Sequence, residues 1–226
     1  MTAMKRLLIL LALVGAVAQA QDKEPVDEAY IAGVPASVYY LMPSFADGMV
    51  YFYSRVPAQG KLNICAIDHT LRFLDKNGQE LQAEDNQGVS KVRIDTVWFL
   101  RSYDYFYRMY PLTADSGLAV KREVKILRDA KEGAYGMVSQ TGAIREINKL
   151  YGDGVSVDIN KNKKVHYEII EELYLYKGGT VAAYNKKNLK KIFPALKPRI
   201  DDYFTTHKTL PHTLDQARAL IMEWSK

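Results

Sequence analysis

Hydrophobic and polar positions alternate with the period of β-strands along most of the chain. Runs rich in Val, Ile, Tyr and Phe recur with turn residues between them, which is typical of antiparallel strands. Segments with this pattern are 48–56, 61–75, 79–85, 92–100, 101–110, 118–127 and 172–184. Asn77-Gly78 and Gly178-Gly179 mark hairpin turns because these dipeptides tolerate positive φ. The pattern predicts an antiparallel β-sandwich or barrel-like domain over residues 37–184.

Two segments within this domain do not follow the alternation. Residues 132–154 have no sustained period and contain five glycines, so we expect a long loop with one short helical turn. Residues 165–176 fit either a strand or a helix. We favour a strand with a bulge or irregularity near Glu171 and Glu172.

The periodicity changes to that of helices after residue 184. Apolar residues recur three and four positions apart in three segments, which Pro194, Pro198 and Pro211 punctuate. Thr213 and Gln216 fit a capping box. The sequence therefore predicts an α+β fold in which a three-helix appendage over residues 185–226 follows the β domain.

The predicted helices are too short to be stable alone in water. We therefore expect their apolar stripe to dock on the β domain. The residues expected to dock are Leu189, Phe193, Phe204, Leu220 and Trp224.

The first twenty residues have the order of a secretory signal peptide. Lys5 and Arg6 precede an apolar run over residues 7–17, and Ala18-Gln19-Ala20 follows as a cleavage signature. The apolar run is shorter than the roughly 20 residues that span a bilayer. We expect an exported protein without a transmembrane span, in which residues 21–36 form a polar leader.

Charge and cysteine content narrow the classes of function. Removal of the predicted signal peptide lowers the formal net charge from +5 to +3, which is too mild for a nucleic-acid-binding protein. The single cysteine, Cys65, cannot form an internal disulfide, so stability must come from an apolar core. Alternation around Cys65 predicts that it is a buried strand residue.

No recognised catalytic or metal-binding motif is present. His207 and His212 are five positions apart around a proline, unlike the i, i+4 pair of a helical zinc site. Residues 158–163 begin like a calcium loop, but Lys163 stands where that loop needs glycine. The Gly-x-Ser-x-Gly motif of many hydrolases is absent. We expect no metal and no cofactor.

Two stretches are candidate contact surfaces. If residues 101–110 form one strand, Tyr103, Tyr105 and Tyr107 share one face. The chain has 16 tyrosines, which suit either a binding surface or a packed core. Four lysines form the polar face of the first predicted helix, where they either meet solvent or attract an acidic partner or anionic lipid. These lysines are Lys186, Lys187, Lys190 and Lys191.

Three stretches in fixed order carry a resemblance to a known family. They are "LDKNGQEL", the stretch from Leu118 that includes Gly133-Ala134-Tyr135-Gly136, and "AAYNKKNLKKIFPALKPRIDDYF" with the helical residues after it. Over residues 45–224 the chain resembles an uncharacterised family of signal-peptide-bearing envelope or secreted proteins of Bacteroidota. Pro211 and His212 depart from the charged residues usual in that family. The resemblance implies a periplasmic or outer-membrane-associated location and no known catalytic residue.

Three functions remain open at this stage. The first is a non-enzymatic binding or assembly module whose partner is an envelope protein. The second is a carrier that holds a small apolar ligand or lipid in its β domain, and the third is a hydrolase of unrecognised type. Nucleic acid is not an expected partner, and the sequence leaves the oligomeric state open.

Overall fold

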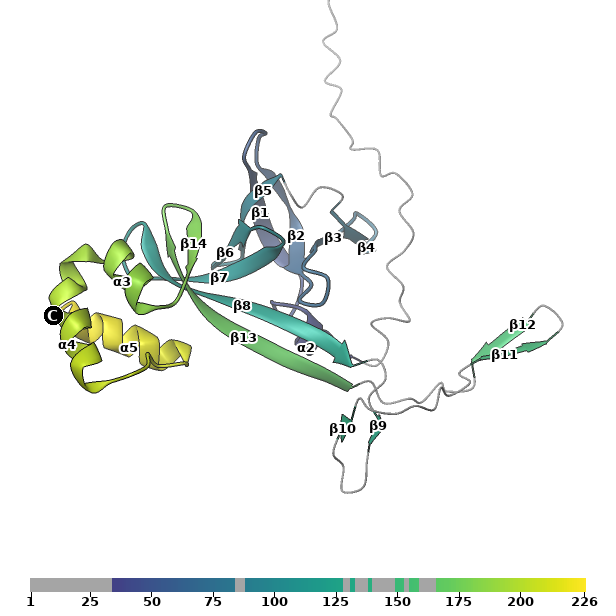
Figure 1. Cartoon of the computed structure of the whole chain (residues 1–226). Coiled ribbons are helices and arrows are strands. Elements are labelled where there is room, and N and C mark those ends of the chain that lie inside the picture. Colours follow the sequence, from purple (N-terminus) through teal and green to yellow (C-terminus); the bar gives the residue numbers. More distant parts are fainter. Residues whose placement is uncertain are drawn as a thin grey trace, which may run out of the picture.

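One antiparallel sheet of ten strands and a set of C-terminal helices form the protein (Figure 1). The computed structural model describes residues 34–83, 88–127, 131–132, 138–139, 149–152, 155–158 and 166–226. In sheet order the strands are β14 (Thr180–Ala183), β13 (His166–Lys177), β8 (Ser116–Leu127), β7 (Tyr105–Pro111), β6 (Val97–Ser102), β5 (Val89–Ile94), β1 (Ala46–Phe52), β2 (Ala58–Ile64), β3 (Leu71–Leu74) and β4 (Glu80–Gln82). The predicted α+β class is confirmed.

The sheet coils on itself between β8 and β2. The Val124 amide on β8 donates to the Ala66 carbonyl just after β2 at 2.9 Å. In the sheet order, β7, β6, β5 and β1 separate β8 from β2. Arg101 on β6 donates from Nη1 to the His69 carbonyl in the same loop at 3.0 Å. Of the two predicted architectures, the continuous coiled sheet is nearer to the barrel-like one.

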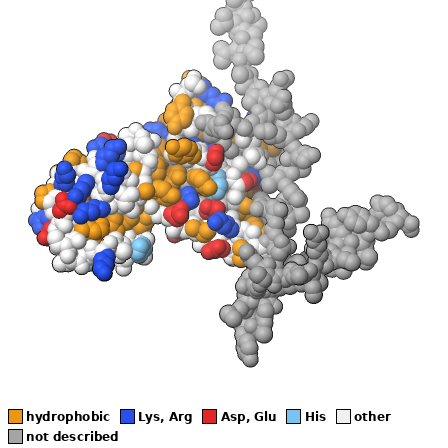
Figure 2. All heavy atoms as spheres, viewed as in Figure 1, with side chains coloured by type: hydrophobic (Ala, Val, Ile, Leu, Met, Phe, Trp, Pro, Cys, Tyr) orange, Lys and Arg blue, Asp and Glu red, His pale blue; other side chains and the backbone are white. Residues whose placement is uncertain are grey.

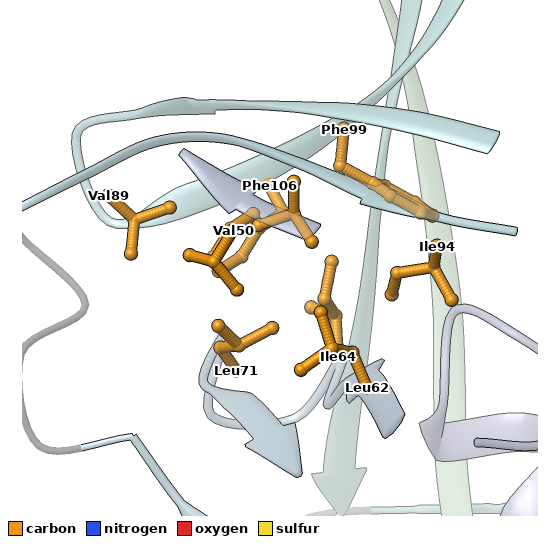
Figure 3. Close-up of a cluster of buried hydrophobic side chains, with 9 residues drawn as sticks. Val50, Leu62, Ile64, Leu71, Val89, Ile94, Phe99 and Phe106 are labelled. Atoms are coloured by element: carbon orange, nitrogen blue, oxygen red, sulfur yellow. The ribbon is translucent and has the colours of Figure 1, made fainter. Parts of the chain in front are cut away.

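The interior of this roll is apolar. Figure 3 shows side chains from several strands pointing toward one another. The buried members are Val50, Leu62, Ile64, Leu71, Val89, Val92, Ile94, Phe99 and Phe106. Inward positions alternate with outward ones along each strand, so this cluster fixes which face of β5, β6 and β7 points outward.

Asn63 ties the chain before β1 to the roll. Its side-chain oxygen accepts from the Met42 amide at 3.1 Å, and its side-chain nitrogen donates to the Met42 carbonyl at 3.1 Å. A short helix, α2 (Ala36–Tyr39), leads to a β-bridge between Tyr40 and Cys65. Cys65 is buried as predicted, although it follows β2 rather than lying within it.

The C-terminal helices cover one face of the sheet at β8, β13 and β14. They are α3 (Lys186–Ile192), the 3₁₀ helix η2 (Pro194–Leu196), α4 (Lys197–Thr206) and α5 (Leu214–Trp224). Asn185 caps α3 and Thr213 caps α5, where the Gln216 amide donates to the threonine hydroxyl as predicted. Within the described residues, no helix is long and apolar enough to cross a membrane.

Helices and strands share a second apolar core. Its buried members are Leu118, Leu175, Leu189, Ile192, Phe193, Leu196, Ile200, Ala217 and Ile221, with Phe204 and Trp224 packed against them. Four of the five residues expected to dock therefore do so. Leu220 does not belong to this cluster, because the turn of α5 directs Ile221 into it instead.

Three predicted strands are wrong because each is interrupted by a turn. Residues 61–75 contain β2, a loop and β3, residues 92–100 contain most of the β5–β6 hairpin, and residues 101–110 span the turn between β6 and β7. The segment 48–56 leaves the strand conformation after Phe52. The turns at Asn77-Gly78 and Gly178-Gly179 are confirmed, with positive φ at the glycines.

Two expectations about the long insertion also need correction. Short strands lie in or beside the predicted loop over 132–154: β9 (Lys131–Glu132), β10 (Val138–Ser139), β11 (Lys149–Gly152) and β12 (Val155–Asp158). The strand predicted over 165–176 is confirmed, but its pairing with β8 keeps one register throughout, so the bulge near Glu171 is wrong. The predicted signal peptide, the Gly133–Gly136 loop and residues 159–163 of the calcium-like segment lie outside the described residues.

Candidate binding face

A tyrosine-rich surface lies on the sheet face opposite the helices. Leu118, Leu173 and Leu175 point into the helical core, so their neighbours on β8 and β13 point the other way. We call Tyr105, Tyr107, Tyr174 and Tyr176 the tyrosine face. Tyr107 and Tyr176 are buried within a cluster that Leu100 and Ala119 complete, and Tyr105 and Tyr174 pack against it half-exposed.

Strand register brings charged residues into the same surface. Tyr107 on β7 is opposite Lys121 on β8, and Lys121 is opposite Glu172 on β13. Directly opposed residues of neighbouring strands point to the same side of a sheet. A lysine therefore lies between two strands of aromatic residues, at the centre of the face.

Lys121 is held by two carboxylates and an aromatic ring. Its Nζ lies 2.6 Å from Glu172 Oε2 and 3.6 Å from Glu123 Oε2, and 4.5 Å from the centroid of the Tyr105 ring. The Tyr174 hydroxyl donates to the same Glu172 oxygen at 3.1 Å. This network satisfies a lysine that is only 9% exposed.

The network keeps Lys121 and Glu172 charged. Burial acts to lower the pKa of Lys121, but the hydrogen bond to Glu172 and the neighbouring negative charges outweigh it, so this pKa is raised. The Lys121 hydrogen bond lowers the pKa of Glu172. Burial raises the pKa of Tyr107 and of Tyr174. The face at neutral pH therefore combines neutral tyrosines with a closed ion pair.

Ring contacts hold the tyrosines in place. Tyr107 and Tyr174 meet edge to face with centroids 5.0 Å apart, and the His69 ring lies 4.4 Å from the Tyr105 ring. Burial lowers the pKa of His69, which favours its neutral form. Aromatic pairs of this kind are pre-ordered, so a partner that packs on them orders few new side chains.

Tyr103 lies at the corner of this surface. Among the described residues, it is the most exposed tyrosine. It lies in the turn between β6 and β7, is 91% exposed and has φ +52°. Bulky residues rarely adopt positive φ because the Cβ atom crowds the backbone. His69, whose ring contacts Tyr105, has φ +56°. Strained residues concentrate at functional sites, so these two mark this corner as a candidate.

The sequence-predicted tyrosines come together only in part. Tyr105 and Tyr107 share one face of β7 as expected, but Tyr103 is in the turn rather than on that strand. Lys121, Glu172, Tyr174 and His69 complete the surface and were missed. The register between β7, β8 and β13 brings these residues together. The sequence of a single strand does not indicate which residues of another strand it will face.

The four predicted lysines divide into two pairs on α3. Lys186 Nζ lies 3.2 Å from Asp201 Oδ1 on α4, and Lys190 contacts the same oxygen. Lys187 and Lys191 are exposed. Figure 2 shows Lys and Arg side chains gathered over the helical end of the molecule. The tail thus uses half of this lysine cluster to join two helices.

Neither Lys121 nor Cys65 has the lowered pKa that activates a covalent nucleophile. A nucleophilic lysine needs a lowered pKa, whereas that of Lys121 is raised. Burial raises the pKa of the Cys65 thiol to about 11, so the reactive thiolate is rare at neutral pH. Within the described residues, no group of three or more His, Cys, Asp and Glu side chains is placed to hold a metal ion.

Comparison with known proteins found no match: no protein-family model, no curated protein and no solved structure matches this chain. The resemblance to a family of Bacteroidota stays a prediction.

Proposed function

We propose that this protein is an exported, non-enzymatic binding module that docks a partner protein of the cell envelope through its tyrosine face. The observation that carries the proposal is Tyr103, an exposed aromatic side chain presented by a turn of positive φ beside Tyr105. A tyrosine in this conformation costs stability that glycine would not. The ring is 91% exposed, so it is available for a contact outside the chain.

The chemistry of the face favours a protein partner. Tyrosine supplies apolar area together with a hydroxyl, and it is enriched where protein interfaces have their strongest contacts. Lys121 and Glu172 neutralise each other, so the centre of the face attracts neither a polyanion nor a polycation. The partner expected here presents apolar side chains, with hydrogen-bonding groups for the tyrosine hydroxyls.

Export and an envelope location belong to the same proposal. They are supported by the order of basic, apolar and small residues in Met1–Ala20. The carrier and hydrolase alternatives stay predictions. A carrier would have to displace the interior side chains that pack against one another in Figure 3.

The test is cross-linked affinity purification from the native envelope, with mass spectrometry to identify partners. We expect the wild-type protein to retain one stoichiometric envelope protein. The variant Tyr103→Ala/Tyr105→Ala/Tyr174→Ala loses it while keeping its circular dichroism spectrum. Tyr107 is left intact because it is buried, and its truncation would open a cavity.

A matched control uses another exposed tyrosine. Tyr53 is 72% exposed and lies on a different hairpin, so Tyr53→Ala should retain the partner.

The purified partner must then bind the purified wild-type protein at least tenfold more tightly than the triple variant. Equal binding to the two proteins would refute the tyrosine face as the interface.

A further inference from the structure

A second surface lies at the other end of the same sheet face, over β1, β5 and β6. The rings of Tyr51 and Trp98 stack with centroids 5.6 Å apart and planes inclined by 28°. The Lys91 ammonium group lies 5.0 Å from each ring centroid, and the Arg93 guanidinium lies 5.9 Å from that of Trp98. We call these four residues the cationic aromatic patch.

An apolar hairpin tip adjoins this patch. Tyr53 and Val56 lie between β1 and β2 and are 72% and 83% exposed. The Tyr53 amide donates to the Gly88 carbonyl at 3.1 Å, which anchors the start of the tip beside β5. Tyr53 is two residues from Tyr51, so the tip directly follows the strand that carries one of the stacked rings.

Two exposed cations belong to this surface, and acidic residues stand only at the borders of its two segments, at Asp47, Asp85 and Asp95. Residues 48–61 and 86–94 contain four Lys or Arg residues and neither Asp nor Glu. Lys91 and Arg93 are exposed. In the part of the chain that the structure describes, neither forms an ion pair with a carboxylate. This contrasts with Lys121, whose charge is neutralised at the opposite end of the face.

We propose that the cationic aromatic patch and the Tyr53–Val56 tip bind the surface of an anionic phospholipid bilayer. Trp and Tyr rings favour the boundary between headgroups and acyl chains, where they expose a polar atom to water. Lys and Arg near an anionic bilayer attract its headgroups, each strengthening binding about fivefold. The tip supplies two apolar side chains that bury in the same boundary.

This inference stands apart from the proposed function. It concerns different residues, and the tyrosine face can bind a partner whether or not the patch binds lipid. Single-stranded nucleic acid also binds cations interleaved with aromatic rings. The lipid surface is favoured because Val56, which is 83% exposed at the tip, offers aliphatic area that neither stacks on a base nor forms a hydrogen bond with one.

Vesicle sedimentation measures the binding directly. The purified full chain is mixed with vesicles of equal parts phosphatidylglycerol and phosphatidylcholine, or of phosphatidylcholine alone. We expect sedimentation with the anionic vesicles only. Lys91→Gln/Arg93→Gln should weaken partitioning by roughly 25-fold, since each cation contributes about fivefold. Tyr53→Ser/Val56→Ser should weaken it as well, and both sites are exposed enough for the fold to persist.

A matched control removes the same charge elsewhere. Lys187→Gln/Lys191→Gln changes two exposed lysines of α3, and it should leave vesicle binding within about twofold of wild type. Loss of binding in this control, with retention in the Lys91/Arg93 variant, would overturn the proposal and make the helical tail the lipid-binding surface. Equal sedimentation with neutral vesicles would overturn it too.

Tryptophan fluorescence locates the contact. The chain has two tryptophans, so Trp224→Phe leaves Trp98 as the sole reporter. We expect its emission to shift to shorter wavelength on addition of anionic vesicles. Binding of lipid by the patch would be refuted if the protein sedimented with vesicles while the Trp98 emission stayed unchanged. It would also be refuted if a single-stranded oligonucleotide displaced the protein from vesicles and shifted the same emission.

Discussion

Two hairpin turns of the sheet place a residue other than glycine at positive φ. Asp95 and Tyr103 each occupy a hairpin turn with φ +52°. A residue other than glycine in this conformation costs about 1–2 kcal/mol. These two turns were not predicted, because hairpins are recognised by the glycines that usually fill such positions. Where glycine is present, at Asn77-Gly78 and Gly178-Gly179, the turns were predicted correctly.

Tyr103→Gly should separate stability from function. Relief of positive φ stabilises the folded state, while the flexibility of glycine stabilises the unfolded state by roughly 0.5–1 kcal/mol. We therefore expect thermal unfolding, followed by circular dichroism, to stay unchanged or to rise by about 2–4 °C, with loss of partner binding.

Asp95→Gly is the matched control because it makes the same backbone change at the β5–β6 turn. It should give a similar thermal shift and leave partner binding intact. A clear fall in the melting temperature of Tyr103→Gly would show that the tyrosine side chain stabilises the fold, and the functional explanation of its conformation would be wrong.

The ion pair of Lys121 predicts a pH dependence. The pKa of Glu172 is lowered in the folded protein. Its contribution to folding stability is therefore present above the ordinary glutamate pKa of about 4.3, and it is lost as pH falls through the lower pKa of the folded state. The raised pKa of Lys121 makes its contribution present below about 10.4 and lost as pH rises through the higher folded value. The pair therefore stabilises the fold between these limits.

Urea unfolding of the wild type and of Glu172→Gln tests this prediction. We expect the variant to be less stable at neutral pH, and the difference between the two proteins to shrink on acidification below about pH 4. Glu168→Gln, an exposed site on the same strand, should show no such convergence. A difference that stays constant with pH would mean that the ion pair does not contribute.

At the scale of elements, the C-terminal helices and the sheet depend on one shared core. Leu189 on α3 and Ile200 on α4 are fully buried against Leu118 and Leu175 of the sheet. Leu189→Ala and Ile200→Ala should each cost about 2–5 kcal/mol, because truncation loses apolar contact and leaves a cavity. Thermal unfolding should then occur roughly 5–15 °C lower.

Met222→Ala on α5 is the control, since that side chain is 52% exposed and its truncation should change the transition little. Truncation after Tyr184 would expose the leucines of the sheet and should lower the yield of folded protein. An unchanged thermal transition in Leu189→Ala and Ile200→Ala would contradict docking of the helices.

Docking of the tail was predictable because helices this short need a partner for their apolar stripe. The exact residues were less so. Ile221 rather than Leu220 enters the core, since a rotation of one residue on a helix changes the side-chain direction by about 100°. The lysines of α3 gave a correct polar face, but their contact with Asp201 depends on the packing of α4 on α3.

At the scale of the whole molecule, strand register creates the candidate site. Alternation along the sequence correctly predicted that Tyr105 and Tyr107 share one face of a strand. The pairing of Tyr107 with Lys121 and of Lys121 with Glu172 arises only when β7, β8 and β13 assemble. Such long-range pairing has no local signal, which is why the lysine at the centre of the face was missed and the aromatic residues around it were partly found.

Position-specific photo-cross-linking tests the central claim most directly. A photoreactive phenylalanine analogue replaces Tyr103 or Tyr174 in one set of proteins and the exposed Tyr53 in another, and each protein is irradiated in its native envelope. The proposal predicts that one envelope protein cross-links from Tyr103 and from Tyr174, and does not cross-link from Tyr53. Cross-links to that protein from Tyr53 alone, or none from Tyr103 and Tyr174, would contradict it.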